Sequence, residues 1–251
     1  MARHLTVITG ASRGMGFAIA HQLIDAGHDL LCISRKTNEA LDRRARERGG
    51  LCEQWPQDLA RASVAAARLE TWLQERSSQP YASATLINNA GLVPKAAPLS
   101  AIAVDDLADA IRVDLEAPLL LTSVFLRATQ SWKGERKVLN ISSGLGRRPM
   151  ASQALYCAAK AGMDHFTRCV ALEEARQPNG AKLCSLAPGV IDTDMQVQLR
   201  SSDPSQFPDL DYFTGIEEQG VLASPEEAAR RVVAYLARPD YGSKPTGDVR
   251  D

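Results

Sequence analysis

Three side chains near the middle of the chain have the types and spacing needed to transfer a proton to a carbonyl group. Ser143 lies thirteen residues before Tyr156, and Lys160 lies four residues after it. On a helix Tyr156 and Lys160 share one face. The ammonium is expected to favour the phenolate and to lower the pKa of Tyr156 from its ordinary value of about 10. The Ser143 hydroxyl would hold the same carbonyl oxygen and share its developing charge. Tyr-x-x-x-Lys is also common on exposed helices, and the reaction needs a hydride donor.

The N-terminal segment has the features of a dinucleotide site. Residues 4–9 predict a buried strand, and Gly10, Gly14 and Gly16 follow it at the start of a helical apolar pattern over 17–26. Glycines permit a tight turn close to a pyrophosphate, whose charge is met by free amides and by the helix dipole. The spacing Gly-x-x-x-Gly-x-Gly differs from the commoner Gly-x-Gly-x-x-Gly. A plain glycine turn is the alternative.

Short apolar runs alternate with helical segments along the whole chain, which predicts a parallel sheet with helices on both faces. The expected strands are 4–9, 29–34, 51–55, 83–88, 136–142 and 181–186, with a last short strand near 247–250. No linker rich in Pro, Ser or Gly divides the chain, so we expect one α/β domain over residues 1–251. Ligands of such sheets bind at the carboxyl ends of the strands, where the motifs described here fall.

Five motifs, in order and spacing, resemble those of the short-chain dehydrogenase/reductase family. They are Thr9-Gly10-x-x-x-Gly14-x-Gly16, Asn88-Asn89-Ala90-Gly91, Asn140-Ile141-Ser142-Ser143, Tyr156-x-x-x-Lys160 and Pro188-Gly189. The resemblance spans residues 4 to about 249 and implies a doubly wound, Rossmann-type sheet and a nicotinamide cofactor. Within the family, residues 154–161 and 187–196 look most like sepiapterin reductase and its bacterial relatives that reduce benzil.

The residues after the second strand predict NADP(H) rather than NAD(H). An NAD site normally has an acidic side chain here for the ribose 2′-hydroxyl, whereas the 2′-phosphate of NADP needs cations. The chain has Ser34, Arg35 and Lys36 at this place. Arg13 could reach the same phosphate, and the resemblance implies that a basic residue there favours NADP. A solvated basic pair at 35 and 36 is the alternative.

The resemblance also assigns the other cofactor contacts. The turn contributes Gly10, Ser12, Arg13, Gly14, Met15 and Gly16. The adenosine end is expected to meet Asp58, Leu59, Asn89, Ala90 and Gly91, and the nicotinamide carboxamide to meet Pro188, Gly189, Val190 and Thr193. Lys160, beside Tyr156, is expected to hold the nicotinamide ribose hydroxyls.

One position departs from the family pattern. The family usually has an asparagine in the middle of the helix after the fourth strand, where it completes a proton relay to the lysine, and this chain has Asp114. An ionised aspartate only accepts hydrogen bonds, whereas asparagine also donates. Asp114 is therefore a candidate catalytic residue whose part in the relay is open.

Residues 193–223 are expected to form a lid over the substrate. The segment is long for a plain connection and carries turn formers together with scattered apolar side chains. A disordered surface loop is the alternative. The next helix is predicted to begin with Ser224 as N-cap, Pro225 in its first position, and Glu226 and Glu227 against the dipole.

Composition excludes several classes of partner. The net charge of the 251 residues is −1 with both signs interspersed, so no nucleic-acid partner is expected. No apolar run is long enough to span a membrane and no signal-like N-terminus is seen, so the cytoplasm is expected. The five cysteines and four histidines show no ligand spacing, which predicts free thiols and no metal. Family members are commonly dimers or tetramers, which apolar Val104, Leu107, Ile111 and Leu115 would permit.

The sequence therefore predicts an NADPH-dependent reductase of a small ketone or diketone, with Tyr156 as the proton donor, Ser143 holding the oxygen and Lys160 tuning the phenol. Two alternatives stay open. One is a reductase of 3-oxoacyl thioesters, and the other is a catalytically silent protein that senses NADP.

Overall fold

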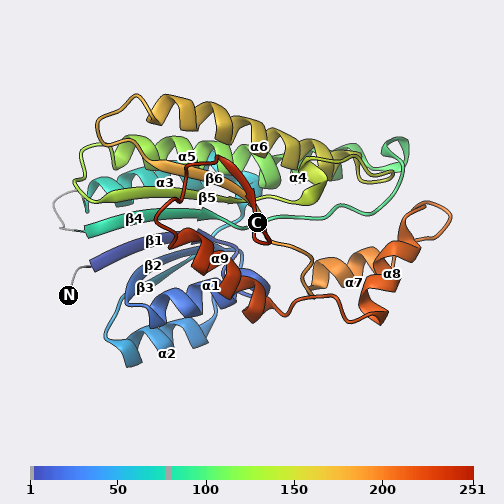
Figure 1. Cartoon of the computed structure of the whole chain (residues 1–251), viewed down its shortest axis with the longest axis horizontal. Coiled ribbons are helices and arrows are strands. Elements are labelled where there is room, and N and C mark those ends of the chain that lie inside the picture. The colour runs from blue at the N-terminus through green and yellow to red at the C-terminus, as the bar shows by residue number, and fades with distance from the viewer. Residues whose placement is uncertain (1–2, 77–80) are drawn as a thin grey trace.

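Seven parallel strands form one sheet at the centre of the molecule (Figure 1). The computed structural model describes residues 3–76 and 81–251. The strands are β1 (Arg3–Thr9), β2 (His28–Ser34), β3 (Cys52–Pro56), β4 (Tyr81–Asn88), β5 (Glu135–Ile141), β6 (Lys182–Ala187) and β7 (Thr246–Asp248). Their order in the sheet is β3-β2-β1-β4-β5-β6-β7. Successive strands are added on one side of β1 up to β3 and on its other side from β4 onwards. This switch point between β1 and β4 creates a crevice at their carboxyl ends. The predicted fold class and all seven expected strands are confirmed, with boundaries that differ by one or two residues.

Helices cover both faces of the sheet. The helices α1 (Gly14–Asp25), α2 (Glu39–Arg48) and α9 (Pro225–Leu236) lie on one face. On the other are α3 (Ala62–Gln74), α4 (Val104–Ile111), α5 (Ala117–Ala128) and α6 (Ala154–Glu174). Each layer closes an apolar core against the nearly continuous hydrophobic strands, as both faces of a parallel sheet require.

The helix after β4 is continuous from α4 into α5 but contains one wider turn. Residues 112–116 form a π-helical turn between the two segments. Such a turn adds a residue to the helix and is often found at functional sites. Here it contains Asp114, which it turns into the interior, with 1% of the residue exposed.

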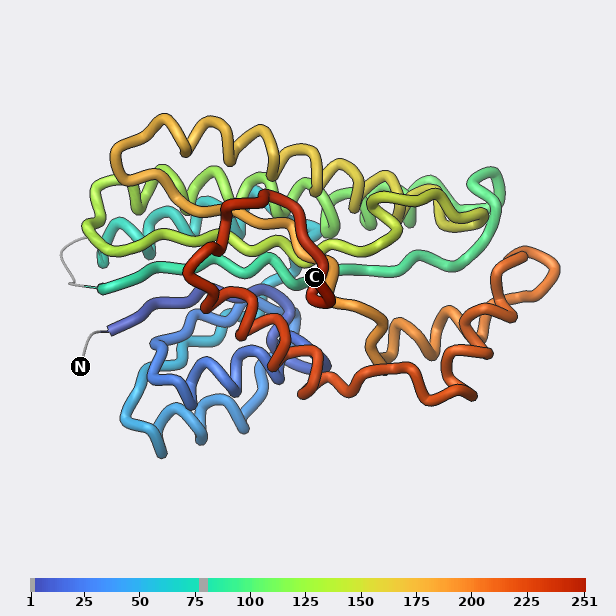
Figure 2. Tube along the Cα trace, viewed as in Figure 1, coloured from blue at the N-terminus to red at the C-terminus, as the bar shows by residue number. Residues whose placement is uncertain are grey.

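The predicted lid is helical. It contains α7 (Asp194–Arg200) and α8 (Leu210–Glu218), which project beyond the carboxyl ends of the strands (Figures 1 and 2). Phe207 and Phe213 pack with Val93 and Leu199 in a small apolar cluster. The cluster fixes α7 and α8 against the loop after β4, so the structure gives no support to a disordered loop. The predicted start of α9 is confirmed, because the Ser224 hydroxyl accepts a hydrogen bond from the Glu227 amide at 3.1 Å.

Candidate active site

One continuous cleft runs along the carboxyl ends of the strands and under α7. It encloses about 1340 Å³, more than the roughly 300–1,000 Å³ of a typical pocket for one ligand. Every residue that the sequence predicts for the cofactor lines it, and so do Ser143, Tyr156 and Lys160. Asp114 is the exception, because it lies behind the cleft wall. A dinucleotide and a substrate can therefore occupy one cavity.

The catalytic candidates come from β5, the turn after it, and α6. Tyr156 and Lys160 lie on α6, and Lys160 Nζ is 5.6 Å from the centre of the Tyr156 ring. The same ammonium donates a hydrogen bond to the carbonyl oxygen of Ile141 at the end of β5, at 2.9 Å. Ser143 caps the short turn that follows β5, where its hydroxyl accepts from the Leu145 amide at 3.2 Å. The carboxyl end of β5 and the turn after it thus hold Lys160 and Ser143 in place beside Tyr156.

Burial controls the protonation of Tyr156. It raises the pKa of the phenol well above its ordinary range, and the nearby negative charge of Asp114 raises that pKa further, while hydrogen bonding with Ser143 lowers it. Burial also lowers the pKa of Lys160, and Asp114 and Asp164 oppose that shift. The sequence predicts that Lys160 lowers the pKa of Tyr156, and burial acts on the same phenol in the opposite direction. Burial therefore favours the protonated phenol.

Asp114 faces the interior behind Gly91. Its Oδ1 accepts a hydrogen bond from the Leu92 amide at 2.7 Å. Burial raises the pKa of this carboxyl, while the charge of Lys160 and the Leu92 amide lower it. The π-helical turn thus brings the carboxyl of Asp114 close to Lys160, at the position where the resemblance implies a neutral asparagine.

Contacts between β1 and the end of β4 hold the glycine turn. Asn89 Nδ2 donates to the carbonyl oxygen of Thr9 at 3.0 Å, and the Thr9 hydroxyl accepts from the amides of Asn89 and Ala90 at 3.0 and 2.9 Å. Gly10 has a φ of +72°, and a Cβ there would lie 2.9 Å from Ala90 Cα. A Cβ on Gly16 would lie 2.3 Å from the Gly10 carbonyl oxygen. Thr9, the first residue of the glycine motif, was not predicted as a site residue.

The residues at the adenosine end fit a 2′-phosphate. The Ser34 hydroxyl is buried and has no hydrogen-bond partner among the described residues. Arg35 and Lys36 are exposed on the cleft, and neither takes part in an ion pair within the described ranges. Asp58 lines the cleft and uses a carboxylate oxygen to accept from the Ala60 amide at 3.0 Å. An unpartnered hydroxyl and two unpaired cations match the charge and acceptor oxygens of a phosphate.

Arg13 reaches towards the lid rather than towards Arg35. Its guanidinium forms an ion pair with Asp194 at the start of α7. Thr193, the residue before Asp194, lies close to the glycine turn, because a Cβ on Gly14 would be 3.9 Å from Thr193 Cγ2. The start of α7 and the glycine turn therefore border the same part of the cleft.

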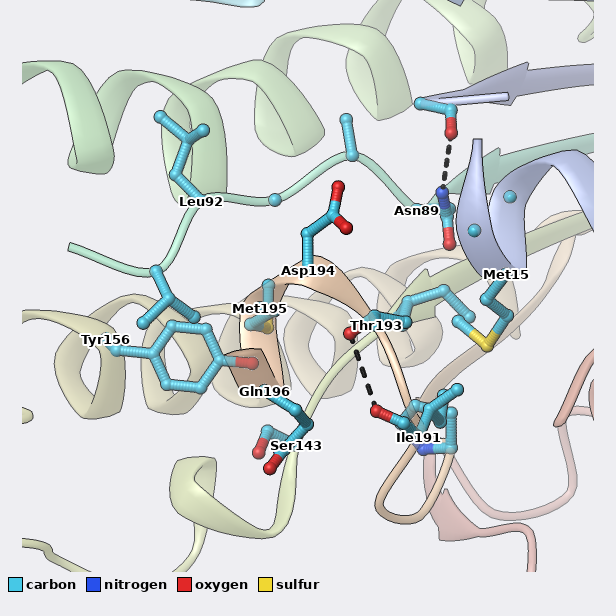
Figure 3. A pocket seen from close by; sticks show the side chains of 18 of the residues that line it. Met15, Asn89, Leu92, Ser143, Tyr156, Ile191, Thr193, Asp194, Met195 and Gln196 are labelled. Carbon is cyan, nitrogen blue, oxygen red and sulfur yellow. Dashed lines mark hydrogen bonds between the residues drawn. The ribbon is translucent and has the colours of Figure 1, made fainter. Parts of the chain in front are cut away.

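The end of the cleft beside Tyr156 and the start of α7 is mostly apolar (Figure 3). Its apolar lining residues are Leu92, Val93, Met150, Met195, Leu199, Tyr212 and Phe213. Gln153 and Gln196 also line it, and neither was predicted from the sequence as a site residue. Their amides carry no recognisable motif, and only the fold brings them to the cavity.

Comparison with known proteins identifies the family. The family model described as short chain dehydrogenase matches residues 4–204. The chain belongs to the short-chain dehydrogenase/reductase family. It is 35% identical to the benzil reductase ((S)-benzoin forming) of Bacillus cereus over 97% of this chain and 96% of that protein. It is 32% identical to the sepiapterin reductase of Xenopus tropicalis over 95% of this chain and 93% of that protein.

Solved structures of the family show the same fold. A metagenomic short-chain oxidoreductase in complex with NADP superimposes with a TM-score of 0.73 at 27% identity, over 97% of this chain and 95% of that one. The chain is therefore an oxidoreductase of the short-chain dehydrogenase/reductase family that acts on carbonyl or CH–OH groups of small molecules. No helix within residues 3–76 and 81–251 is long and apolar enough to cross a membrane. In the same ranges, no group of His, Cys, Asp and Glu side chains could hold a metal ion.

Proposed function

We propose that this protein is an NADPH-dependent reductase of small ketones or diketones with apolar substituents. The observation that carries the proposal is the position of Tyr156, a half-buried phenol whose pKa is raised, beside Ser143 at the base of an apolar pocket. A phenol in this state can donate a proton but is a poor base, which suits reduction better than alcohol oxidation. The benzil and sepiapterin reductases among the relatives support the same substrate class.

The residues of the chain divide the chemical work. A bound nicotinamide dinucleotide supplies the hydride. Ser143 donates a hydrogen bond that holds the carbonyl oxygen, and Tyr156 Oη gives that oxygen its proton as negative charge develops. An alkoxide is more basic than a phenolate, so a raised Tyr156 pKa still permits this transfer. The bond from Lys160 to the Ile141 carbonyl oxygen keeps the ammonium beside the phenol.

The choice of NADPH rests on the adenosine end of the cleft. Ser34, Arg35 and Lys36 provide a hydroxyl and two cations, with no acidic side chain at these positions for a ribose 2′-hydroxyl. The NADP complex of a related enzyme supports this choice. Structures of the same fold also contain NAD, as in NAD⁺-bound xylitol dehydrogenase. The fold alone therefore does not select the cofactor.

The test is an assay of NADPH oxidation by the purified protein with benzil, sepiapterin and a 3-oxoacyl thioester. We expect benzil or sepiapterin to be reduced with a higher kcat/KM than the thioester, and NADPH to be preferred over NADH. Faster reduction of the thioester would favour the 3-oxoacyl reductase. NADPH binding without oxidation of any substrate would favour a sensing protein.

We also propose a cytoplasmic homodimer or homotetramer. Val104 on α4 is 78% exposed, and Leu107, Ile111 and Leu115 continue an apolar stripe along the same helix and its π-helical turn. Light scattering of the purified protein would measure the mass of the assembly, and a monomer would contradict the proposal.

A further inference from the structure

Two glutamine side chains in the substrate pocket have unpartnered polar atoms. Gln153 Nε2 and Gln196 Oε1 are buried and have no hydrogen-bond partner among the described residues. Gln153 is 4% exposed and Gln196 is 9% exposed. A buried amide without a partner is costly, and native structures usually satisfy such groups. Both residues line the cavity, so a ligand oxygen there can accept from Gln153 Nε2, and from Gln196 once a half-turn of its amide exchanges Oε1 and Nε2.

Their positions place both amides near the reacting carbonyl. Gln153 lies three residues before Tyr156 at the start of α6, and Gln196 lies three residues after Thr193 on α7. Both residues line the same cavity as Ser143 and Tyr156. Figure 3 shows the Gln196 side chain extending from α7 towards Ser143. The two residues thus belong to the wall of the cavity that contains the catalytic hydroxyls, one at the start of α6 and the other on the lid.

We propose that Gln153 and Gln196 bind the second, non-reacting oxygen of an α-dicarbonyl substrate. This inference rests on the proposed carbonyl reductase function and narrows its substrate class. In an α-diketone the two carbonyl groups are on adjacent carbons, so when Ser143 and Tyr156 hold one oxygen the other must lie close by. A carbonyl oxygen has two lone pairs and can accept from two N–H donors. Each amide can turn to present its NH₂ group.

The surroundings of the amides favour a dicarbonyl over a simple ketone. Apart from the catalytic hydroxyls, the walls around the substrate are largely apolar, with Val93, Met150 and Phe213 among them. Such walls accept aryl or alkyl groups on either side of the two carbonyls. A simple ketone fills the same walls but leaves both amides unpaired. Sites that bind a substrate oxygen through buried donors discriminate strongly against analogues that lack it.

The experiment compares benzil with deoxybenzoin, in which a CH₂ group replaces one of the two carbonyls. Gln196→Met and Gln153→Met keep the approximate length of the side chain and remove its amide. For each variant, kcat/KM relative to wild type is measured with both substrates, so the difference in intrinsic reactivity between the ketones cancels. We expect a loss of about tenfold with benzil and a change of less than about twofold with deoxybenzoin.

Two further variants separate binding from a structural role. In Gln219→Met the same side-chain change is made at the end of α8, where Gln219 is exposed and does not line the cavity. We expect this variant to change kcat/KM by the same factor with both substrates. Gln196→Glu keeps the shape but, when ionised, only accepts hydrogen bonds, so it should lose activity with benzil as Gln196→Met does.

The outcomes for this inference and for the proposed function are distinct. Wild-type protein that reduces neither ketone contradicts the reductase function itself. A second outcome is that wild-type protein reduces benzil but the Gln153 and Gln196 variants change kcat/KM equally for both substrates, or for neither. That outcome overturns the α-dicarbonyl site and leaves the reductase function intact. Equal losses would mean that the amides only support the pocket wall.

Discussion

The carboxylate of Asp114 and the ammonium of Lys160 both lie close to Gly91, without forming a direct ion pair within the described residues. A Cβ on that glycine would lie 3.5 Å from Asp114 Oδ1 and 3.7 Å from Lys160 Nζ. Asp114 is 1% exposed and Lys160 is 4% exposed, so neither charge is well solvated. Charges in such a setting act on their neighbours more strongly than surface charges do. The negative charge of Asp114 therefore bears directly on the proton of Tyr156.

Asp114→Asn should move the alkaline limit of reduction to lower pH. The Asp114 charge raises the pKa of Tyr156, so a neutral amide lets that pKa fall. Reduction needs the protonated phenol, so activity is lost at a lower pH, whereas alcohol oxidation needs the phenolate and should improve near neutrality. The measurement is kcat against pH in both directions. Asp106→Asn, on the exposed surface of α4 outside the cleft, removes a charge of the same sign as a control. Superimposable profiles for wild type and Asp114→Asn would show that Asp114 does not act on the phenol.

Tyr156→Phe should abolish reduction and leave NADPH binding nearly unchanged. The phenol acts on the carbonyl oxygen, and proton transfer by a positioned side chain contributes about 10²–10⁴-fold to the rate. Binding of NADPH can be followed by its fluorescence, and turnover by its oxidation. Tyr212→Phe removes a hydroxyl from the lid side of the same cleft and serves as the control. Substantial turnover by Tyr156→Phe would mean that another group is the acid.

The sequence predicted the sheet and the cofactor cleft well because both depend on local patterns. Strands such as β2 and β6 are short apolar runs between helical segments, and glycines such as Gly16 stand where a side chain would collide with the backbone. The end of each strand then places its motif at the same edge of the sheet. Ser143 and Tyr156 meet for this reason although they come from different elements.

Other features depend on packing that no local pattern records. The helices α7 and α8 are short, and their turn formers predict a loop, but Phe207 and Phe213 stabilise them through contacts with Val93 and Leu199. The pKa of Tyr156 depends on how deeply the phenol is buried, and spacing to Lys160 does not reveal burial. Gln153 belongs to no motif, and it becomes a candidate only when the cavity beside it is known.

Arg35→Ala should weaken NADPH binding much more than NADH binding. Only NADPH carries the 2′-phosphate, and a hydrogen bond to a charged group is worth about 1.5–3 kcal/mol, or roughly ten- to a hundredfold in Kd. The dissociation constants of both cofactors can be measured by fluorescence titration. Arg46→Ala removes an exposed cation from α2 outside the cleft and should change neither constant. Equal losses for NADPH and NADH would contradict the assignment of NADP.

Asp194→Asn should strengthen NADPH binding and leave NADH binding almost unchanged. Arg13 forms an ion pair with Asp194, although the sequence predicts that Arg13 contacts the 2′-phosphate. If Arg13 must leave Asp194 to reach that phosphate, loss of the carboxylate charge removes the competition. The pair is exposed, and such pairs contribute little, so the expected gain is about two- to fivefold in Kd.

The matched background for this test is Arg13→Ala. Without the guanidinium, the Asp194 carboxylate and the 2′-phosphate have nothing to compete for. Asp194→Asn should therefore leave the Kd for NADPH unchanged in the Arg13→Ala protein. A general electrostatic effect of the lost carboxylate would strengthen the binding of NADH as well, because both cofactors carry the pyrophosphate. A gain shared equally by NADPH and NADH would therefore show that Arg13 stays with Asp194 and that Arg35 and Lys36 alone bind the 2′-phosphate.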